Sequence, residues 1–446
     1  MNIKSLQYRL RLTLRVFAIL VLAAAASSAQ KAGVAGMVTE YDVAGLKVIV
    51  KQRPGVPTVS AGLFIRGGSR NLTAESAGIE NMMLSAATEG SVGYPRESLR
   101  RELARTGSQL SSSSGRDFSV LAMSATKENF DSSWKLMVDV ALRPVFNKQD
   151  VERTRDRIIS GLEGIEDAPD EFLQALKERS IYAGTSYAND PDGTIENIRR
   201  FTVADLVAYH KRVMTKSQLL LVVVGDLDPE SLRVRAETAF AGLPTGQYKD
   251  APLPKLDFSK PTINIVERSL PTNYVSGAFE APTVGTRDYY AMQVAVTILR
   301  DRVFAEVRDR RQLSYAPSAS MDSAGANTGE IYVTAVRADE AVEAMLAEVE
   351  GMRTTLVEPQ ELSGVAGQFL TTHYVAQETN AAQASELARY ELLGGGWRNS
   401  LSFLENIRRV SREDVRDVSR RYLRNFRFVV IGDPKAITRS KFTQQP

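Results

Sequence analysis

The chain contains no cysteine among its 446 residues. Without thiols it can have neither a disulfide framework nor a thiolate metal site, so its stability has to come from packed cores. Histidine is almost as scarce, because His210 and His373 are the only two. A lone histidine is more often a surface or satisfied core residue than a ligand, so we expect neither to bind a metal.

A large excess of one charge is also absent. The formal net charge is +3, and four positive charges fall within residues 1–29, where no acidic residue opposes them, so the remainder carries −1. A nearly neutral chain gives no argument for nucleic acid as a partner.

The first 29 residues have the layout of a secretory signal peptide. A basic start is followed by an apolar run over 16–26 and by Ser27-Ser28-Ala29, small residues of the kind found at a cleavage site. The run is too short to span a bilayer comfortably. An uncleaved membrane anchor is the alternative, and the only way in which we expect a membrane to be a partner. Export without cysteine indicates a periplasmic or otherwise exported protein.

An internal repeat divides the rest of the chain. Residues 201–226 and 410–433 share one pattern, in which Thr202 or Ser411 precedes an acidic first turn and a run of Leu, Val, Ile or Phe ends at Gly-Asp. Each copy predicts a capped helix followed by a buried strand. The copies lie more than two hundred residues apart, which is the size of a whole domain.

The chain is too long for a single core, and the repeat predicts two homologous domains. Turn residues gather at 242–258, which we interpret as a linker between an N-terminal domain at 36–241 and a C-terminal domain at 259–440. Each mixes both element types, so we predict an α+β fold with helices over sheets. Strands are expected at 46–51, 59–65 and 118–125, and helices at 96–106, 128–142, 148–166 and 170–182.

Residues 78–91 read Gly-Ile-Glu-Asn-Met-Met-Leu-Ser-Ala-Ala-Thr-Glu-Gly-Ser. This stretch resembles the zinc-binding helix of the pitrilysin and mitochondrial processing peptidase family, which runs from Gly-aliphatic-Ala-His through Glu-His to Gly-Ser or Gly-Thr. Residues 64–70 resemble the strand and Gly-Ser turn that precede it. The resemblance covers roughly 37–435 and implies two domains, each a mostly antiparallel sheet covered by helices, that form half of a clamshell.

The chemical groups of that family's zinc motif are missing from this chain. In His-x-x-Glu-His, two imidazoles on one helix face bind zinc and the glutamate takes a proton from the bound water. Here Asn81 and Ser85 stand at the histidine positions and Leu84 at the glutamate position. The third ligand, a carboxylate on a later helix, falls near Ser160 or Gly161. We therefore expect no cofactor and no self-sufficient catalytic site.

Two acidic residues flank this degenerate motif. Glu80 directly precedes Asn81, and Glu89 follows Ser85 by four residues. We expect a solvated helix face and a helix end here, and not chemical groups. Met82 and Met83 are expected to pack in the core.

A second segment keeps its matching residues. Residues 304–317 read Phe-Ala-Glu-Val-Arg-Asp-Arg-Arg-Gln-Leu-Ser-Tyr-Ala-Pro, which resembles the segment from which active family members take an arginine and a tyrosine seven residues apart. In the family these two side chains bind substrate and help to stabilise the tetrahedral oxyanion. Arg308 and Tyr315 match them. The alternative is a helix end with a capping arginine and a packed tyrosine, and Arg310 and Arg311 are expected to be solvated.

Two weaker features accompany the resemblance. Ser111 to Ser114 falls where the family has a sheet edge that receives substrate as an added strand, although a polar run can equally begin an ordinary solvent-facing strand. Gly394 to Gly396 precedes Trp397 and predicts a helix stop and turn.

Together these features indicate a non-catalytic subunit of a periplasmic zinc-metallopeptidase heterodimer. It would bind extended peptides and contribute Arg308 and Tyr315 to the active site of a zinc-bearing homologous subunit. Proteolysis is expected only with that partner, which would hold the zinc. A structural or assembly subunit and a peptide-binding chaperone without a peptidase role are the alternatives. A peptidase with another site is disfavoured, because no nucleophile-plus-base constellation is visible.

Overall fold

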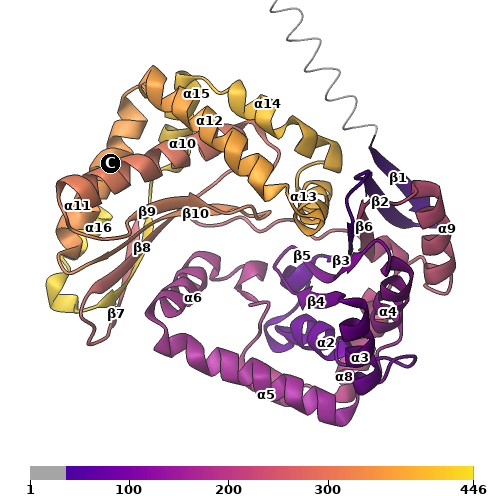
Figure 1. Cartoon of the computed structure of the whole chain (residues 1–446). Coiled ribbons are helices and arrows are strands. Elements are labelled where there is room, and N and C mark those ends of the chain that lie inside the picture. Colours follow the sequence, from indigo (N-terminus) through magenta and orange to yellow (C-terminus); the bar gives the residue numbers. More distant parts are fainter. Residues whose placement is uncertain (1–36, 445–446) are drawn as a thin grey trace, which may run out of the picture.

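A computed structural model describes residues 37–444, which form two β-sheets flanked by helices (Figure 1). The predicted signal peptide, residues 1–29, lies outside the described residues. Within 37–444, the longest apolar helical stretches fall short of what crossing a membrane requires.

The N-terminal sheet has six strands in the order β1-β2-β6-β3-β5-β4. All neighbours are antiparallel except β2 and β6, which are parallel. Strand β6 is buried at all seven positions, because its Leu and Val run is covered on both faces. The strands are β1 (Val38–Val43), β2 (Leu46–Gln52), β3 (Thr58–Arg66), β4 (Gln109–Ser113), β5 (Phe118–Thr126) and β6 (Leu219–Gly225).

The C-terminal sheet repeats this topology with one strand fewer. Its order is β7-β11-β8-β10-β9, and β7 and β11 are its parallel pair. Matching the two orders pairs β7 with β2, β11 with β6, β8 with β3, β10 with β5 and β9 with β4. The strands are β7 (Thr262–Glu267), β8 (Asn273–Glu280), β9 (Ser318–Met321), β10 (Thr328–Ala335) and β11 (Arg427–Gly432).

Helices cover both sheets, which confirms the predicted α+β class. The predicted helices all occur, with ends displaced by no more than two residues. The N-terminal half carries α2 (Ile79–Ala87), α3 (Arg96–Thr106), α4 (Phe130–Leu142), α5 (Lys148–Gly164), α6 (Pro169–Tyr182), α7 (Ile195–Arg200), α8 (Val203–Val213) and α9 (Pro229–Phe240). The C-terminal half carries α10 (Arg287–Val303), α11 (Ala338–Thr354), α12 (Pro359–Ala376), α13 (Asn380–Leu393), α14 (Phe403–Arg408), α15 (Arg412–Tyr422) and α16 (Arg439–Thr443).

The internal repeat is confirmed down to its helix caps. Helices α8 and α15 both begin with a capping box, in which the N-cap hydroxyl accepts from the backbone three residues later and that residue's carboxylate accepts from the N-cap backbone. The hydroxyl bonds measure 3.2 Å for Thr202 and Asp205 and 3.0 Å for Ser411 and Asp414. Each helix leads into an interior strand of its sheet, β6 or β11.

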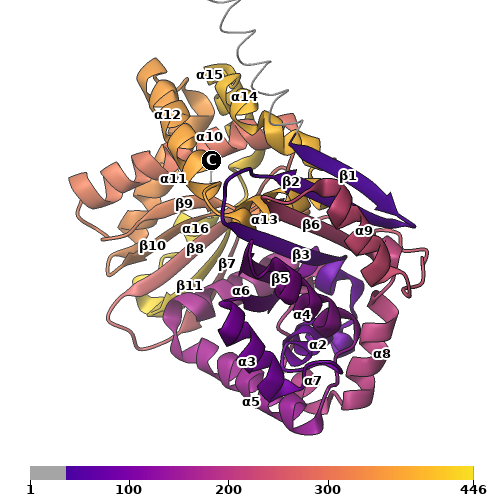
Figure 2. The ribbon, with the colours of Figure 1, turned by 45° about the vertical axis from the view of Figure 1, so that its right-hand side comes forward.

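The two halves exchange one helix each. Helix α6 packs on β8 and β11 of the C-terminal sheet, where Phe172 and Leu173 meet Val429 and Ile431. Helix α13 packs in return on β3 and β6 of the N-terminal sheet (Figure 1, Figure 2). Each half therefore completes the core of the other, which holds the two sheets in a fixed relation.

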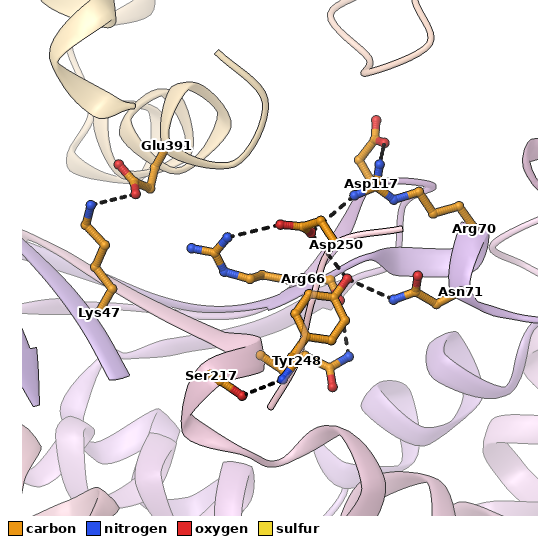
Figure 3. Close-up of polar contacts among 10 residues, drawn as sticks. Lys47, Arg66, Arg70, Asn71, Asp117, Ser217, Tyr248, Asp250 and Glu391 are labelled. Atoms are coloured by element: carbon orange, nitrogen blue, oxygen red, sulfur yellow. Dashed lines mark hydrogen bonds and ion pairs between the residues drawn. The ribbon is translucent and has the colours of Figure 1, made fainter. Parts of the chain in front are cut away.

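The segment between α9 and β7 is tied to both halves. The backbone N–H of Tyr248 donates to Ser217 Oγ at 3.0 Å, and Asp250 pairs with Arg66 and Arg70 of the N-terminal half at 3.4 and 3.3 Å (Figure 3). Farther on, Phe258 is buried in an apolar cluster that includes residues of both halves. This segment, residues 241–261, therefore connects the two halves and is called the strap below.

Candidate functional site

Helix α2 carries the positions of the degenerate zinc motif. It follows Gly78, whose φ of 90° and contact with Gly193 leave no room for a side chain, since a Cβ would lie 2.7 Å from the Gly193 Cα. Met82 and Met83 are completely buried, as predicted for core residues. The helix is thus fixed against the N-terminal sheet.

The three motif positions hold side chains that are already engaged with the protein. Ser85 Oγ donates to Asn81 Oδ1 at 3.4 Å, which confirms that the i and i+4 positions share one face. The Asn81 amide donates to Asp192 Oδ1 at 2.9 Å, and Leu84 is 2% exposed in the core. Ser160 and Gly161, at the third ligand position, are exposed.

This set of side chains does not fit zinc. Zinc sites are built from imidazole, thiolate and carboxylate ligands, whereas an amide, a hydroxyl and a leucine stand here. Across residues 37–444 no group of three or more histidine or acidic side chains is arranged to hold a metal ion. A proton-accepting group is also missing at Leu84, so the helix offers no hydrolytic chemistry of its own.

Glu80 corrects one expectation from the sequence, because it is not on a solvated helix face. Its side chain is 2% exposed and accepts hydrogen bonds from Ser119 Oγ and Tyr209 Oη. Burial raises the pKa of its carboxyl group, although the two hydrogen bonds act in the opposite direction. Glu80 is an internal acid that the short amphipathic pattern of α2 does not reveal.

We expect Glu80→Gln to stabilise the protein increasingly as pH rises above the unfolded pKa of the glutamate and toward its raised folded pKa. A carboxyl group whose pKa is raised on folding favours the folded state fully below its unfolded pKa of about 4.3, and that contribution is lost as pH rises through the folded pKa. Glutamine cannot ionise, so the gain should grow by up to about 1.4 kcal/mol per pH unit in that interval. Urea unfolding of both proteins at several pH values measures it, and parallel stability curves would contradict the prediction.

The segment with Arg308 and Tyr315 has an unusual backbone. Helix α10 continues from Phe304 to Arg310 as a π-helix, a wider coil that often occurs at functional sites. It ends where Gln312 adopts a left-handed φ of 53° and the Leu313 N–H donates to Val307 O at 2.9 Å. This turn sends the chain back toward Arg308.

The structure brings the two predicted side chains together. The guanidinium carbon of Arg308 lies 4.1 Å from the ring centre of Tyr315 and 4.8 Å from that of Phe304, and Nη1 donates to Tyr315 O at 3.0 Å. Tyr315 is 78% exposed, so the packed tyrosine of the alternative interpretation is wrong. Both side chains line a pocket of about 560 Å³.

Arg308 differs from its neighbours in its electrostatic environment. The exposed Arg310 and Arg311 both pair with Glu306, and these hydrogen bonds lower the pKa of that carboxyl group. Arg308 forms no ion pair within the described part of the chain and rests instead between two aromatic rings. A cation held in this way, beside an exposed phenol, is a suitable donor to a carbonyl or anionic oxygen.

Two further pocket residues were not found from the sequence. Phe304 forms one wall, and Tyr332 comes from β10, where its hydroxyl donates to Asp170 of α6. Phe304 belongs to the segment 304–317 described above, but no sequence pattern assigned it a role in the site. No local sequence pattern indicated Tyr332, because only the pairing of β10 in the sheet and the exchange of α6 bring it to the pocket.

The weaker sequence features fall as predicted. Ser111 to Ser113 lie in β4, which pairs only with β5 and forms the sheet edge within the described residues. Helix α13 ends at Leu393, and the Gly396 N–H, in a residue with φ of 117°, donates to Tyr390 O at 3.0 Å. The glycine run is therefore a helix stop.

Both histidines have packing roles. His210 Nε2 lies 2.7 Å from Ala141 O, and burial lowers the pKa of its ring. The His373 ring stacks on Phe403 with centres 5.5 Å apart, and burial lowers its pKa as well. Neither lies in a cluster of potential ligands among the described residues.

Comparison with known proteins gives the same relationship as the motifs. A family model described as insulinase (peptidase family M16) matches residues 47–191, and one described as the peptidase M16 inactive domain matches 200–368. An uncharacterized zinc protease of Rickettsia felis is 20% identical over 378 residues, 83% of this chain and 91% of the relative. Mitochondrial cytochrome b-c1 complex subunit 1 of Bos taurus is 26% identical over 258 residues, 57% of this chain and 53% of the relative, so the match spans about half of the bovine subunit.

A solved structure shares the whole architecture. The peptidase M16 inactive domain from Pseudomonas fluorescens superimposes with a TM-score of 0.78 at 19% identity, covering 89% of this chain and 97% of that chain. The two family models follow each other along most of residues 47–368, and the superposition shows the same fold. The chain belongs to peptidase family M16, the insulinase family.

Proposed function

We propose that this chain is the zinc-less subunit of a heterodimeric zinc metallopeptidase. In this proposal a homologous partner holds the zinc, and this chain supplies Arg308 and Tyr315 to the shared active site. The observation that carries the proposal is the contrast between the two sites. The zinc positions hold Asn81, Leu84 and Ser85, while Arg308 and Tyr315 still converge on one pocket.

Peptide binding is the second part of the proposal. The free edge of β4 offers unpaired backbone donors and acceptors, which can bind an extended peptide with little regard to its sequence. The serines of β4 add no bulk or charge that would oppose a neighbouring strand. The basic and apolar start of the chain leads us to place the complex in the periplasm.

A reconstitution assay tests this function. The substrate is an extended peptide with a fluorophore and a quencher, offered to the chain alone, to its zinc-bearing homologue from the same organism, and to their mixture. We expect no cleavage by the chain alone and a faster rate for the mixture than for the homologue. The two proteins should also co-elute in size-exclusion chromatography.

Two results would count against the proposal. Cleavage by the purified chain alone, sensitive to a chelator, would show a metal site that the side chains do not indicate. A partner whose rate is unchanged by this chain would leave a structural or assembly role as the better account. The match to subunit 1 of the cytochrome b-c1 complex would support that account, because this relative is named as a subunit of a complex and not as a peptidase.

A further inference from the structure

Within residues 37–444, the C-terminal sheet has no counterpart of β1. In the N-terminal sheet, β1 pairs antiparallel with β2 from Val38 to Val43 and forms the outer edge. Its repeat equivalent would lie beside β7, which pairs only with β11 and is itself the edge strand within the described residues. The repeat therefore leaves one strand position open.

Within residues 37–444, few outward backbone groups of β7 are bonded, although helix α16 packs against this strand. The N–H groups of Thr262 and Arg268 donate to Phe426 O and Gly432 O on the β11 side, so even-numbered residues face β11. In a parallel strand the odd-numbered residues, 263, 265 and 267, then point their N–H and C=O outward. Within residues 37–444, Ile263 O accepts from Arg439 Nη2 at 2.9 Å, whereas Ile265 uses neither outward group.

The repeat also fixes which residues of an added strand would face which residues of β7. Lys47 pairs with Leu220 and Thr262 with Arg427, and each partner lies five positions before the glycine that ends its strand. Thr262 thus corresponds to Lys47, which faces Asp42 of β1. By the same register, the residue corresponding to Glu40 would lie opposite Asn264.

These register positions lie over a basic hollow. Thr262 and Asn264 line a hollow of about 420 Å³ together with Arg179 of α6 and Arg427 of β11. Arg179 is exposed and forms no ion pair within the described residues, and Arg427 bonds only the neutral oxygens of Asp257 O and Thr262 Oγ1. Neither guanidinium group forms an ion pair among the described residues, although the Asp257 carboxylate lies near enough to Arg427 for that charge to help lower the pKa of Asp257.

The N-terminal half shows how such a position is filled. There Glu40 of β1 is held by Lys47 at 3.2 Å, by Arg398 at 2.9 Å and by the Trp397 indole N–H at 2.8 Å. The cations come from the neighbouring strand and from the segment that follows α13, the exchanged helix. In the C-terminal half the position of Lys47 is taken by Thr262, and the nearby positive charges are Arg427, one strand farther in on β11, and Arg179 on the exchanged helix α6.

We propose that the outer edge of β7 is a binding site for an extended acidic peptide, which adds as an antiparallel strand and places alternate carboxylates over Arg179 and Arg427. Backbone bonds to Ile265 would supply affinity, and the two arginines would select acidic side chains. This site lies on a different sheet from the β4 edge. It does not depend on the proposed peptidase role.

A peptide with the sequence of residues 37–44, Met-Val-Thr-Glu-Tyr-Asp-Val-Ala, is a matched probe because its parent strand fills the equivalent position. Binding of the fluorescein-labelled peptide to the full chain can be measured by fluorescence polarisation at low salt. Ile265→Pro removes the outward N–H without touching a bond to β11, and should abolish binding. Arg179→Glu reverses an exposed charge and should weaken binding by about tenfold.

Two controls test whether binding depends on this edge and on the acidic side chains. Arg199→Glu makes the same charge change at an exposed residue of α7 and should leave the affinity unchanged. A peptide with Glu40→Lys and Asp42→Lys should not bind. If the probe fails to bind, or binds Ile265→Pro and Arg179→Glu as tightly as the parent chain, the proposal is overturned. If Ile265→Pro does not fold, Arg179→Glu decides. A variant that folds should stimulate the zinc-bearing partner as the parent chain does.

Discussion

Arg308→Ala is expected to lower kcat/KM of the reconstituted peptidase by about 10²- to 10³-fold, the usual loss when one donor to a developing oxyanion is removed. The guanidinium group lies against the ring of Tyr315 and forms no ion pair among the described residues, although Asp301 lines the same pocket. Alanine removes both the positive charge and the stacked plane. Steady-state kinetics with this chain in excess over its partner measures the change.

A neighbouring arginine provides the matched control. Arg310 is exposed and pairs with Glu306, outside the lining of the pocket, so Arg310→Ala should leave kcat/KM unchanged. Arg308→Lys keeps the charge but loses the planar fork and should recover only part of the rate. Equal losses for Arg308→Ala and Arg310→Ala, or failure of Arg308→Ala to co-elute with the partner, would mean that the substitution acts on the fold or the interface.

Local sequence patterns predicted the internal repeat and the shared face of the degenerate zinc motif. The caps at Thr202 and Ser411 and the buried runs that follow them gave the repeat, because a capping box and an apolar strand each involve only neighbouring residues. The shared face of Asn81 and Ser85 followed from helix geometry alone. The proximity of Arg308 and Tyr315 was predicted only through resemblance, since a π-helix and a left-handed Gln312 produce it.

Packing between residues that lie far apart in the sequence could not be predicted from such local patterns. The apolar face of α6 shows that the helix is buried, but it does not show that the covering sheet belongs to the other half. The burial of Glu80 depends on Tyr209, which lies 129 residues away. Tyr332 joins the pocket through the pairing of β10 for a similar reason.

Asp117→Ala is expected to destabilise the folded chain by about 3–5 kcal/mol, because it leaves the buried Tyr187 hydroxyl, the Gly325 N–H and one side of the Arg70 guanidinium without an acceptor. Asp117 is 7% exposed and joins the two halves, because Oδ2 accepts from the Gly325 N–H of the C-terminal half at 2.8 Å. Its other oxygen accepts from Tyr187 Oη. That oxygen also lies 3.5 Å from Arg70 Nη1, a pair drawn in Figure 3. Urea unfolding measures the change.

Asp250→Ala is the informative comparison, because both aspartates pair with Arg70. Asp250 is 46% exposed and lies 3.3 Å from Arg70 Nη2, so solvent screens the pair and its loss should cost at most about 1 kcal/mol. If the two substitutions destabilise the chain equally, the strap rather than the buried contact holds the halves together. If Asp117→Ala alone has the large effect, the sheets are joined through Gly325 and Tyr187. The pocket of Arg308 should then keep its shape even when the strap is loosened, because Tyr332 and Asp170 connect it to α6 independently.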